Sequence, residues 1–124
     1  MKEKIKFILD ELKNNNYIIL SNTISEGLVY KIHYKGDLNT TGYERGFLVL
    51  TKGSSIKEHI HTKEVEKYKL LLGKLSINGK EQKENICLLN ESHMIDKVDE
   101  VTIIETFKMA KELLHNNKIK VKKV

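Results

Sequence analysis

The chain has 124 residues, of which 40% are hydrophobic, 31% are charged and 6% are aromatic. This composition is typical of one compact globular domain and excludes an intrinsically disordered chain. The apolar runs are far shorter than the ~20 residues that a membrane-spanning helix needs, and the N-terminal residues mix acid and base without the apolar stretch of a secretory signal. We therefore expect a cytoplasmic protein with no membrane partner.

The net charge is +5, which raises the question of a nucleic-acid partner. Arg45 is the only arginine, and the lysines alternate with acidic residues along most of the chain, as is typical of a solvated surface. Only residues 118–124 form a purely basic cluster. We interpret this cluster as a solubilising tail and expect no nucleic-acid partner.

The first predicted element is an amphipathic helix over residues 2–14. Its apolar side chains follow the i, i+3, i+4, i+7 spacing, at Ile5, Ile8, Leu9 and Leu12. A run of asparagines at residues 14–16 then ends the pattern. We expect this helix, within residues 1–16, to pack on the domain that follows.

From Tyr17 onward the hydrophobic period changes to two, and turn residues separate short apolar segments. This pattern predicts about eight strands. They include residues 28–34, 43–51, 56–61, 65–72, 85–89, 92–98 and 101–107. Asn78-Gly79 is a strong signal for a two-residue hairpin turn. A second helical pattern runs from Phe107 to His115.

Short strands with helices only at the two ends predict an all-β, mainly antiparallel fold, either a small barrel or a double-sheet jelly roll. We expect one β-barrel domain over residues 17–107 and a C-terminal helix with the basic tail over residues 108–124. We see no internal repeat and no interdomain linker.

A group of histidines and one glutamate carries the strongest chemical signal. His59 and His61 are separated by one residue, so on a strand both imidazoles point to the same face, as two ligands of one metal ion require. Glu66 shares an apolar face of the next strand with Tyr68, and a buried carboxylate requires a cation. His93 begins a later strand and can complete the site from across the barrel.

Several of these residues also have simpler interpretations. A His-x-His pair alone fits a surface or structural role, and His93 alone fits an exposed turn histidine. We expect His33 to be exposed. Cys87 is the only cysteine, so it makes no internal disulfide, and we interpret it as a core thiol rather than a nucleophile. Glu105 is expected at an inward or edge position, where it can support the ligands.

Residues 53–73 resemble the first motif of the cupin superfamily, G-x5-H-x-H-x4-E-x6-G, at every specified position. The resemblance covers residues 17–107. It implies a jelly-roll barrel of six to eight strands, as in the family, with a metal held by His59, His61 and Glu66. The family's second motif, G-x5-P-x-G-x2-H-x3-N, is matched only at His93. Its other positions are occupied by Gln82, Leu88, Asn90 and Lys97. Asn90 can still adopt the left-handed conformation that a glycine would supply.

The resemblance implies a divalent metal cofactor, with iron, manganese or nickel ahead of zinc because the donor set is mixed and leaves room for further ligands. Cupins include dioxygenases, isomerases and decarboxylases as well as non-enzymatic binding proteins. Our leading hypothesis is a metal-dependent enzyme, of dioxygenase or isomerase type, that acts on a small oxygen-rich or anionic metabolite. Tyr68 or Tyr43 is a candidate proton donor in the pocket. A small-molecule-binding or regulatory cupin is the alternative.

We also expect a homodimer. A barrel of this length has exposed sheet edges that must be covered or blunted, and cupins commonly pair their N-terminal strands.

Overall fold

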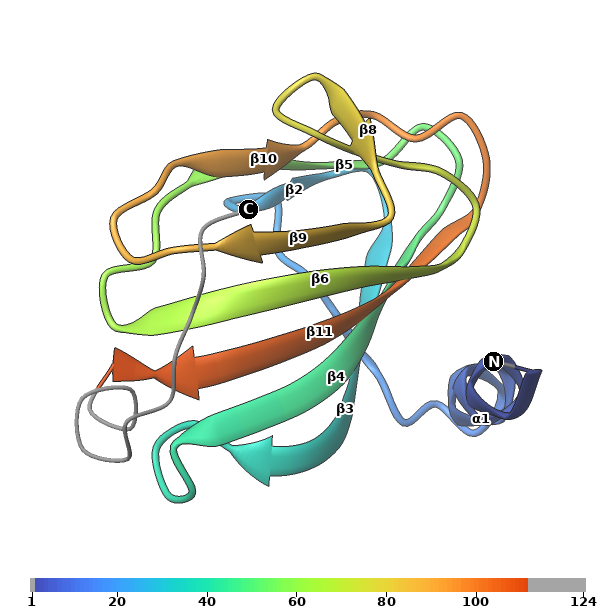
Figure 1. Cartoon of the computed structure of the whole chain (residues 1–124). Coiled ribbons are helices and arrows are strands. Elements are labelled where there is room, and N and C mark those ends of the chain that lie inside the picture. Colours follow the sequence, from blue (N-terminus) through green and yellow to red (C-terminus); the bar gives the residue numbers. More distant parts are fainter. Residues whose placement is uncertain (1, 112–124) are drawn as a thin grey trace.

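The computed structural model describes residues 2–111, which form one helix and eleven strands (Figure 1). The elements are α1 (Lys2–Lys13), β1 (Ile18–Ile19), β2 (Ser25–Glu26), β3 (Val29–Asp37), β4 (Tyr43–Leu50), β5 (Ser55–His59), β6 (Glu64–Leu72), β7 (Leu75–Ile77), β8 (Lys80–Gln82), β9 (Glu84–Cys87), β10 (His93–Ile95) and β11 (Thr102–Ala110). No helix in this part of the chain is long and apolar enough to cross a membrane.

The strands form two sheets, which appear as two layers in Figure 1. One sheet has six strands in the order β1-β3-β4-β11-β6-β9, and the other has five in the order β2-β5-β10-β7-β8. Every neighbouring pair is antiparallel, which confirms the expected mainly antiparallel β fold. The two sheets fit the double-sheet jelly roll that the sequence predicted as one of two alternatives, and the described strands are not joined into one closed barrel.

A core of apolar side chains fills the space between the two layers. It includes Leu48 and Ile104 from the six-stranded sheet and Ile56 and Ile95 from the five-stranded sheet. Because this core holds the sheets together, it also determines how residues at their rim face one another.

A second core lies on the opposite face of the six-stranded sheet, beneath α1 (Figure 1). Ile8 of the helix packs there with Ile32, Phe47 and Val49. The four residues from Phe47 to Leu50 are therefore all buried, because this strand is covered on both faces. The predicted helix is confirmed, although Leu9, which belongs to its apolar stripe, is 55% exposed.

Two turns, one of them the predicted hairpin, have the backbone geometry that their residues favour. Asn78 and Gly79 have φ angles of 52° and 80°, and they join the antiparallel strands β7 and β8 as the hairpin signal predicts. Gly73, the last residue of the motif, has a φ angle of 86°. A Cβ atom there would lie 2.6 Å from both Oγ1 of Thr102 and the carbonyl oxygen of Val101, so only glycine fits.

The C-terminal helix expected over Phe107–His115 is not shown. Residues 107–110 belong to β11, which hydrogen-bonds with β4 on one side and β6 on the other. Pairing with two long neighbouring strands thus overrides the helical propensity of residues 107–110. The rest of the expected helix and the basic tail lie at residues 112–124, outside the described part of the chain.

The position of α1 leads to a stability prediction. We expect Ile8→Ala to lower the free energy of unfolding by about 2–4 kcal/mol, because it removes a fully buried side chain from beneath the helix. Leu9→Ala, one residue further on and exposed, serves as the matched control and should cost less than about 1 kcal/mol. Urea unfolding of both variants measures the difference. Equal losses would show that the helix does not pack as described.

Candidate metal centre

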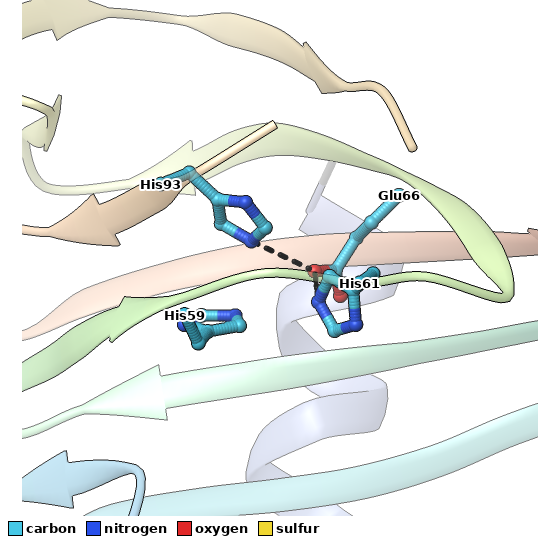
Figure 2. A group of neighbouring side chains, drawn as sticks. All are labelled: His59, His61, Glu66 and His93. Atoms are coloured by element: carbon cyan, nitrogen blue, oxygen red, sulfur yellow. Dashed lines mark hydrogen bonds and ion pairs between the residues drawn. The ribbon is translucent and has the colours of Figure 1, made fainter. Parts of the chain in front are cut away.

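Four of the residues singled out in the sequence converge at one end of the space between the sheets (Figure 2). His59 ends β5 and His93 begins β10, and these two residues are paired in the five-stranded sheet. His61 lies in the turn after β5, and Glu66 lies on β6 of the opposite sheet. One nitrogen or carboxylate oxygen from each of the four lies within 4.8 Å of the others.

The three imidazole rings pack against one another. Their centroids are separated by 4.2 Å between His59 and His93, 4.9 Å between His59 and His61, and 5.1 Å between His61 and His93. Burial, together with the neighbouring His93 and His61, lowers the pKa of His59, although its contact with a backbone carbonyl opposes this effect. The cluster therefore favours at least one neutral imidazole with a free nitrogen lone pair.

Each imidazole has an oxygen within hydrogen-bonding distance of its Nδ1 atom. The partners are the carbonyl oxygen of Lys57 at 2.7 Å for His59, Oε1 of Glu64 at 2.9 Å for His61, and the carbonyl oxygen of Glu91 at 3.2 Å for His93. A carbonyl oxygen only accepts, so Nδ1 of His59 and Nδ1 of His93 carry the proton and donate it, while Nδ1 of His61 forms an ion pair with Glu64. This arrangement leaves Nε2 of His59 and of His93 with a lone pair for a metal ion, whereas Nε2 of His61 contacts Oε1 of Glu66.

The Nε2 atom of His93 is the least satisfied polar atom of the cluster. His93 is 1% exposed, and its Nε2 is the buried side-chain atom that has no hydrogen-bond partner within residues 2–111. With the proton on Nδ1, this Nε2 atom carries a lone pair, and Oε1 of the ionised Glu66, 3.7 Å away, has no proton to donate to it. A buried group without a partner costs about 1–3 kcal/mol, and a cation at the centre of the cluster would remove this cost.

Glu66 supplies the negative charge of the cluster, and it is 3% exposed. Its Oε1 accepts hydrogen bonds from Oη of Tyr68 at 2.7 Å and from Nε2 of His61 at 3.1 Å, and its Oε2 lies 3.9 Å from Nζ of Lys108. Burial by itself raises the pKa of Glu66, but His61, His93, Lys108 and Tyr68 together outweigh it and hold the pKa far below its usual range. The carboxylate therefore stays ionised.

The same contacts determine the protons of the two neighbours. The hydrogen bond to Glu66 raises the pKa of His61, so without a metal this ring tends to hold a second proton on Nε2. Burial and the adjacent carboxylate raise the pKa of Tyr68 well above its usual value, so the phenol remains a donor. A metal ion bound here would displace the Nε2 proton of His61.

A cavity of about 130 Å³ opens beside the cluster. Its polar wall includes His59, His61, Glu66 and Tyr68, so a ligand inside it would touch the candidate metal ligands. The remaining lining residues are Leu20, Ile24, Lys31, Leu48, Ile56, Thr106 and Lys108.

Two of the expected supporting residues lie elsewhere. Glu105 is on the outer face of β11 and pairs with Lys4 of α1 at 2.9 Å. Ile103, two residues before Glu105 on the same face of β11, belongs to the core beneath the helix. The alternation of Ile103, Glu105 and Phe107 therefore marks the outer face of the strand rather than the inner one. Tyr43 packs on the ring of Phe107 and does not line the cavity, whereas Tyr68 does.

The turn before His93 has the left-handed residue that its sequence allows at Asn90. Asn90 has a φ angle of 61°, the left-handed conformation expected in place of glycine, and its backbone nitrogen donates to the carbonyl oxygen of His61 at 2.8 Å. This bond ties the two turns that carry His61 and His93. His33 is exposed, and Cys87 is buried, as expected. Burial and the nearby Glu66 raise the pKa of the Cys87 thiol to about 12, so it is not a nucleophile.

The sequence interpretation missed Lys108 and Thr106. Both face the cavity from β11, alternating with Glu105 and Phe107 on the other face. The alternation typical of a strand continues beyond Phe107 and could have identified both residues. A helical pattern was assigned to the same residues instead.

The fold is that of known cupins. A protein described as a predicted oxalate decarboxylase from Thermotoga maritima has 23% identity and a TM-score of 0.66, with 77% of this chain and 92% of that chain covered. An acetylacetone dioxygenase from Acinetobacter johnsonii has 18% identity and a TM-score of 0.64, with 77% and 69% covered. A cupin-2 domain protein from Rhodospirillum rubrum has 11% identity and a TM-score of 0.60, with 77% and 70% covered.

No family model matches the chain, and no curated protein matches it. These three structures are all below 25% identical to this chain, so they establish the fold alone. The chain has the cupin fold, and the resemblance of residues 53–73 to the superfamily is confirmed at this level.

The unsatisfied nitrogen of His93 leads to a second prediction. We expect His93→Leu to leave the free energy of unfolding of the metal-free protein unchanged within about 1 kcal/mol, or to raise it, because leucine replaces a buried atom that lacks a partner. Ile95→Ala, two residues further along β10 and equally buried, should cost about 2–4 kcal/mol. Urea unfolding in the presence of a chelator measures both. A large loss in His93→Leu would mean that the imidazole supports the fold.

Proposed function

We propose that this chain is a metal-dependent cupin enzyme of dioxygenase or isomerase type. It binds one divalent ion through His59, His61, Glu66 and His93 and acts on a small oxygen-rich or anionic metabolite. The convergence of the four side chains carries the proposal, because it buries an ionised carboxylate among three imidazoles whose Nδ1 atoms are all engaged.

The donor set fits a divalent transition metal. Three neutral imidazoles and one carboxylate would leave a bound dication with a net charge near +1, and they suit iron, manganese or nickel better than the closed tetrahedral site of structural zinc. A bound ion would supply Lewis acidity toward an oxygen-donor ligand in the cavity. The solvent opening of the cavity supports turnover, since a substrate can enter and a product can leave.

The residues of this chain have distinct roles in the proposal. The oxygens at the three Nδ1 atoms orient the rings, and Tyr68 holds Oε1 of Glu66 from the inner side. Leu48 and Ile56 line the cavity and exclude water from part of it. The proton on Oη of Tyr68 faces the cluster and is the candidate proton donor.

Metal content tests the proposal directly. Protein produced without an affinity tag, with iron, manganese, nickel and zinc supplied separately, should contain close to one equivalent of one of these metals by elemental analysis. At concentrations one hundred times its Kd, that metal should stabilise the metal-free protein by about 2.7 kcal/mol. Protein that takes none of the four metals would favour a small-molecule-binding cupin without metal chemistry.

Removing the charge of the cluster should weaken metal binding. We expect Glu66→Gln to raise the metal Kd at least tenfold, since the amide keeps the shape but loses the only negative charge among the four ligands. His33→Ala, on an exposed position of β3, should leave the Kd unchanged. Isothermal titration calorimetry compares the two variants. Equal affinities would remove Glu66 from the ligand set.

A homodimer formed through the β1 edge completes the proposal. β1 is an edge strand of the six-stranded sheet, and its residues Ile18 and Ile19 are 62% and 58% exposed. Ile24 and Leu28, which lie nearby in the chain, are also exposed. An open edge that carries large apolar side chains favours pairing with a second copy.

Light scattering tests the dimer. At micromolar concentrations the mass should be twice the 14.4 kDa of one chain. Ile19→Lys should shift it toward the monomer because a charge would be buried at the edge. Leu9→Lys, at an equally exposed apolar position on α1, should remain dimeric. A monomer mass for the unmodified protein would refute the dimer.

A further inference from the structure

On the six-stranded sheet, the side chains that β11 turns toward the cavity change from apolar to charged along the strand. Ile104 lies in the core between the sheets, Thr106 lines the cavity, and Lys108 ends the row beside Glu66. These three residues alternate along the strand, so they share its inner face. The side chain of Lys108 is 21% exposed, and its Nζ lies 3.9 Å from Oε2 of Glu66. A cation thus lies beside Glu66, at the end of a row of residues that begins in the apolar core.

Lys108 and Lys31 both line the cavity, but their charges are balanced differently. Lys31 lies 3.5 Å from Oε2 of Glu44, a residue outside the metal cluster. The acidic partner of Lys108 within residues 2–111 is Glu66, which is itself a candidate metal ligand. A divalent ion held by the cluster would neutralise Glu66 and leave Lys108 without a counter-ion.

The charge of the loaded site then follows by simple addition. Three neutral imidazoles, one carboxylate and a divalent ion give +1, Lys108 adds one positive charge, and Glu64 beside Nδ1 of His61 subtracts one, so the local charge remains near +1. Excess positive charge in a partly enclosed, largely apolar cavity attracts an anion strongly. The cavity volume of about 130 Å³ suits an anion of a few carbon atoms.

The apolar residues that line the cavity indicate what the rest of the ligand should be. Leu20, Ile24, Leu48 and Ile56 line the cavity and offer no hydrogen-bonding side chains. They suit a short aliphatic group rather than the row of hydroxyls that a sugar carries. The ligand should therefore be anionic at one end and apolar at the other.

We infer that Lys108 is a specificity-determining residue that recognises the carboxylate of a short-chain 2-oxo or 2-hydroxy acid. The carboxylate lies between the metal cluster and Nζ of Lys108, the neighbouring oxygen faces the cluster, and the aliphatic end contacts Leu48 and Ile56. This inference rests on the proposed metal-binding function.

Cobalt-loaded protein provides a readout that does not require activity, because the visible absorption of Co²⁺ responds to new ligands. Titrations use 2-oxobutanoate as the anionic probe and 1-hydroxy-2-butanone as a neutral probe of similar size. The proteins compared are the unmodified chain, Lys108→Met, Lys108→Arg and Lys67→Met. Lys67 on β6 is the matched control. It pairs with Phe107, the residue before Lys108 on β11, and its side chain is exposed on the opposite face of the sheet.

We expect Lys108→Met to raise the Kd for 2-oxobutanoate at least tenfold, Lys108→Arg to retain most of the affinity, and Lys67→Met to change it less than twofold. The neutral probe should bind all four proteins within a factor of two, because it carries no charge for Lys108 to contact. Cobalt affinity should be no weaker in Lys108→Met, since the lysine competes with the metal for Glu66. Lys108→Gln replaces the methionine variant if that variant does not fold.

The outcomes separate the two proposals. Protein that shows no cobalt spectrum would overturn the metal-binding function, and the inference with it. Cobalt-loaded protein that binds 2-oxobutanoate equally well with and without Lys108, or does not bind it at about 10 mM, would overturn the inference alone. An equal loss of both probes in Lys108→Met would assign Lys108 to the shape of the cavity and would also overturn it.

Discussion

The burial of one ionised carboxylate governs the arrangement of this site. Glu66 lies between two sheets where water is scarce, and a lone charge there would be strongly destabilising. It is retained because His61, Tyr68 and Lys108 surround its two oxygens. These contacts make the metal-free fold possible, and the same carboxylate would meet a divalent ion without having to be deprotonated first.

The cluster depends on the whole fold because its members come from both sheets. His59 and His93 belong to the five-stranded sheet and Glu66 to the six-stranded sheet, so their distances depend on the core between the layers. The six-stranded sheet is in turn covered on its outer face by α1. Substitutions beneath the helix can therefore alter the site without touching any of its residues, by changing how the sheets pack.

Local spacing predicted much of the site, because His59, His61 and Glu66 are close in the chain and alternate along strands. His93 was proposed only because it begins a later strand, since its pairing with the distant His59 leaves little trace in local periodicity. Lys108 and Glu105 were misplaced for two physical reasons. Strand pairing overrides a helical pattern at residues 107–110. The cover of α1 also makes the outer face of β11 as apolar as its inner face.

The location of the site follows from a polarity gradient along the inside of the fold. Leu75, Ile77 and Val98 belong to a region of the inner core that is packed with apolar side chains. Histidines, a carboxylate and lysines gather instead around the cavity. Charged groups this close together are tolerated only where solvent partly screens them, or where a bound cation and anion neutralise them. The inner core can therefore provide rigidity while the charged rim remains free to bind.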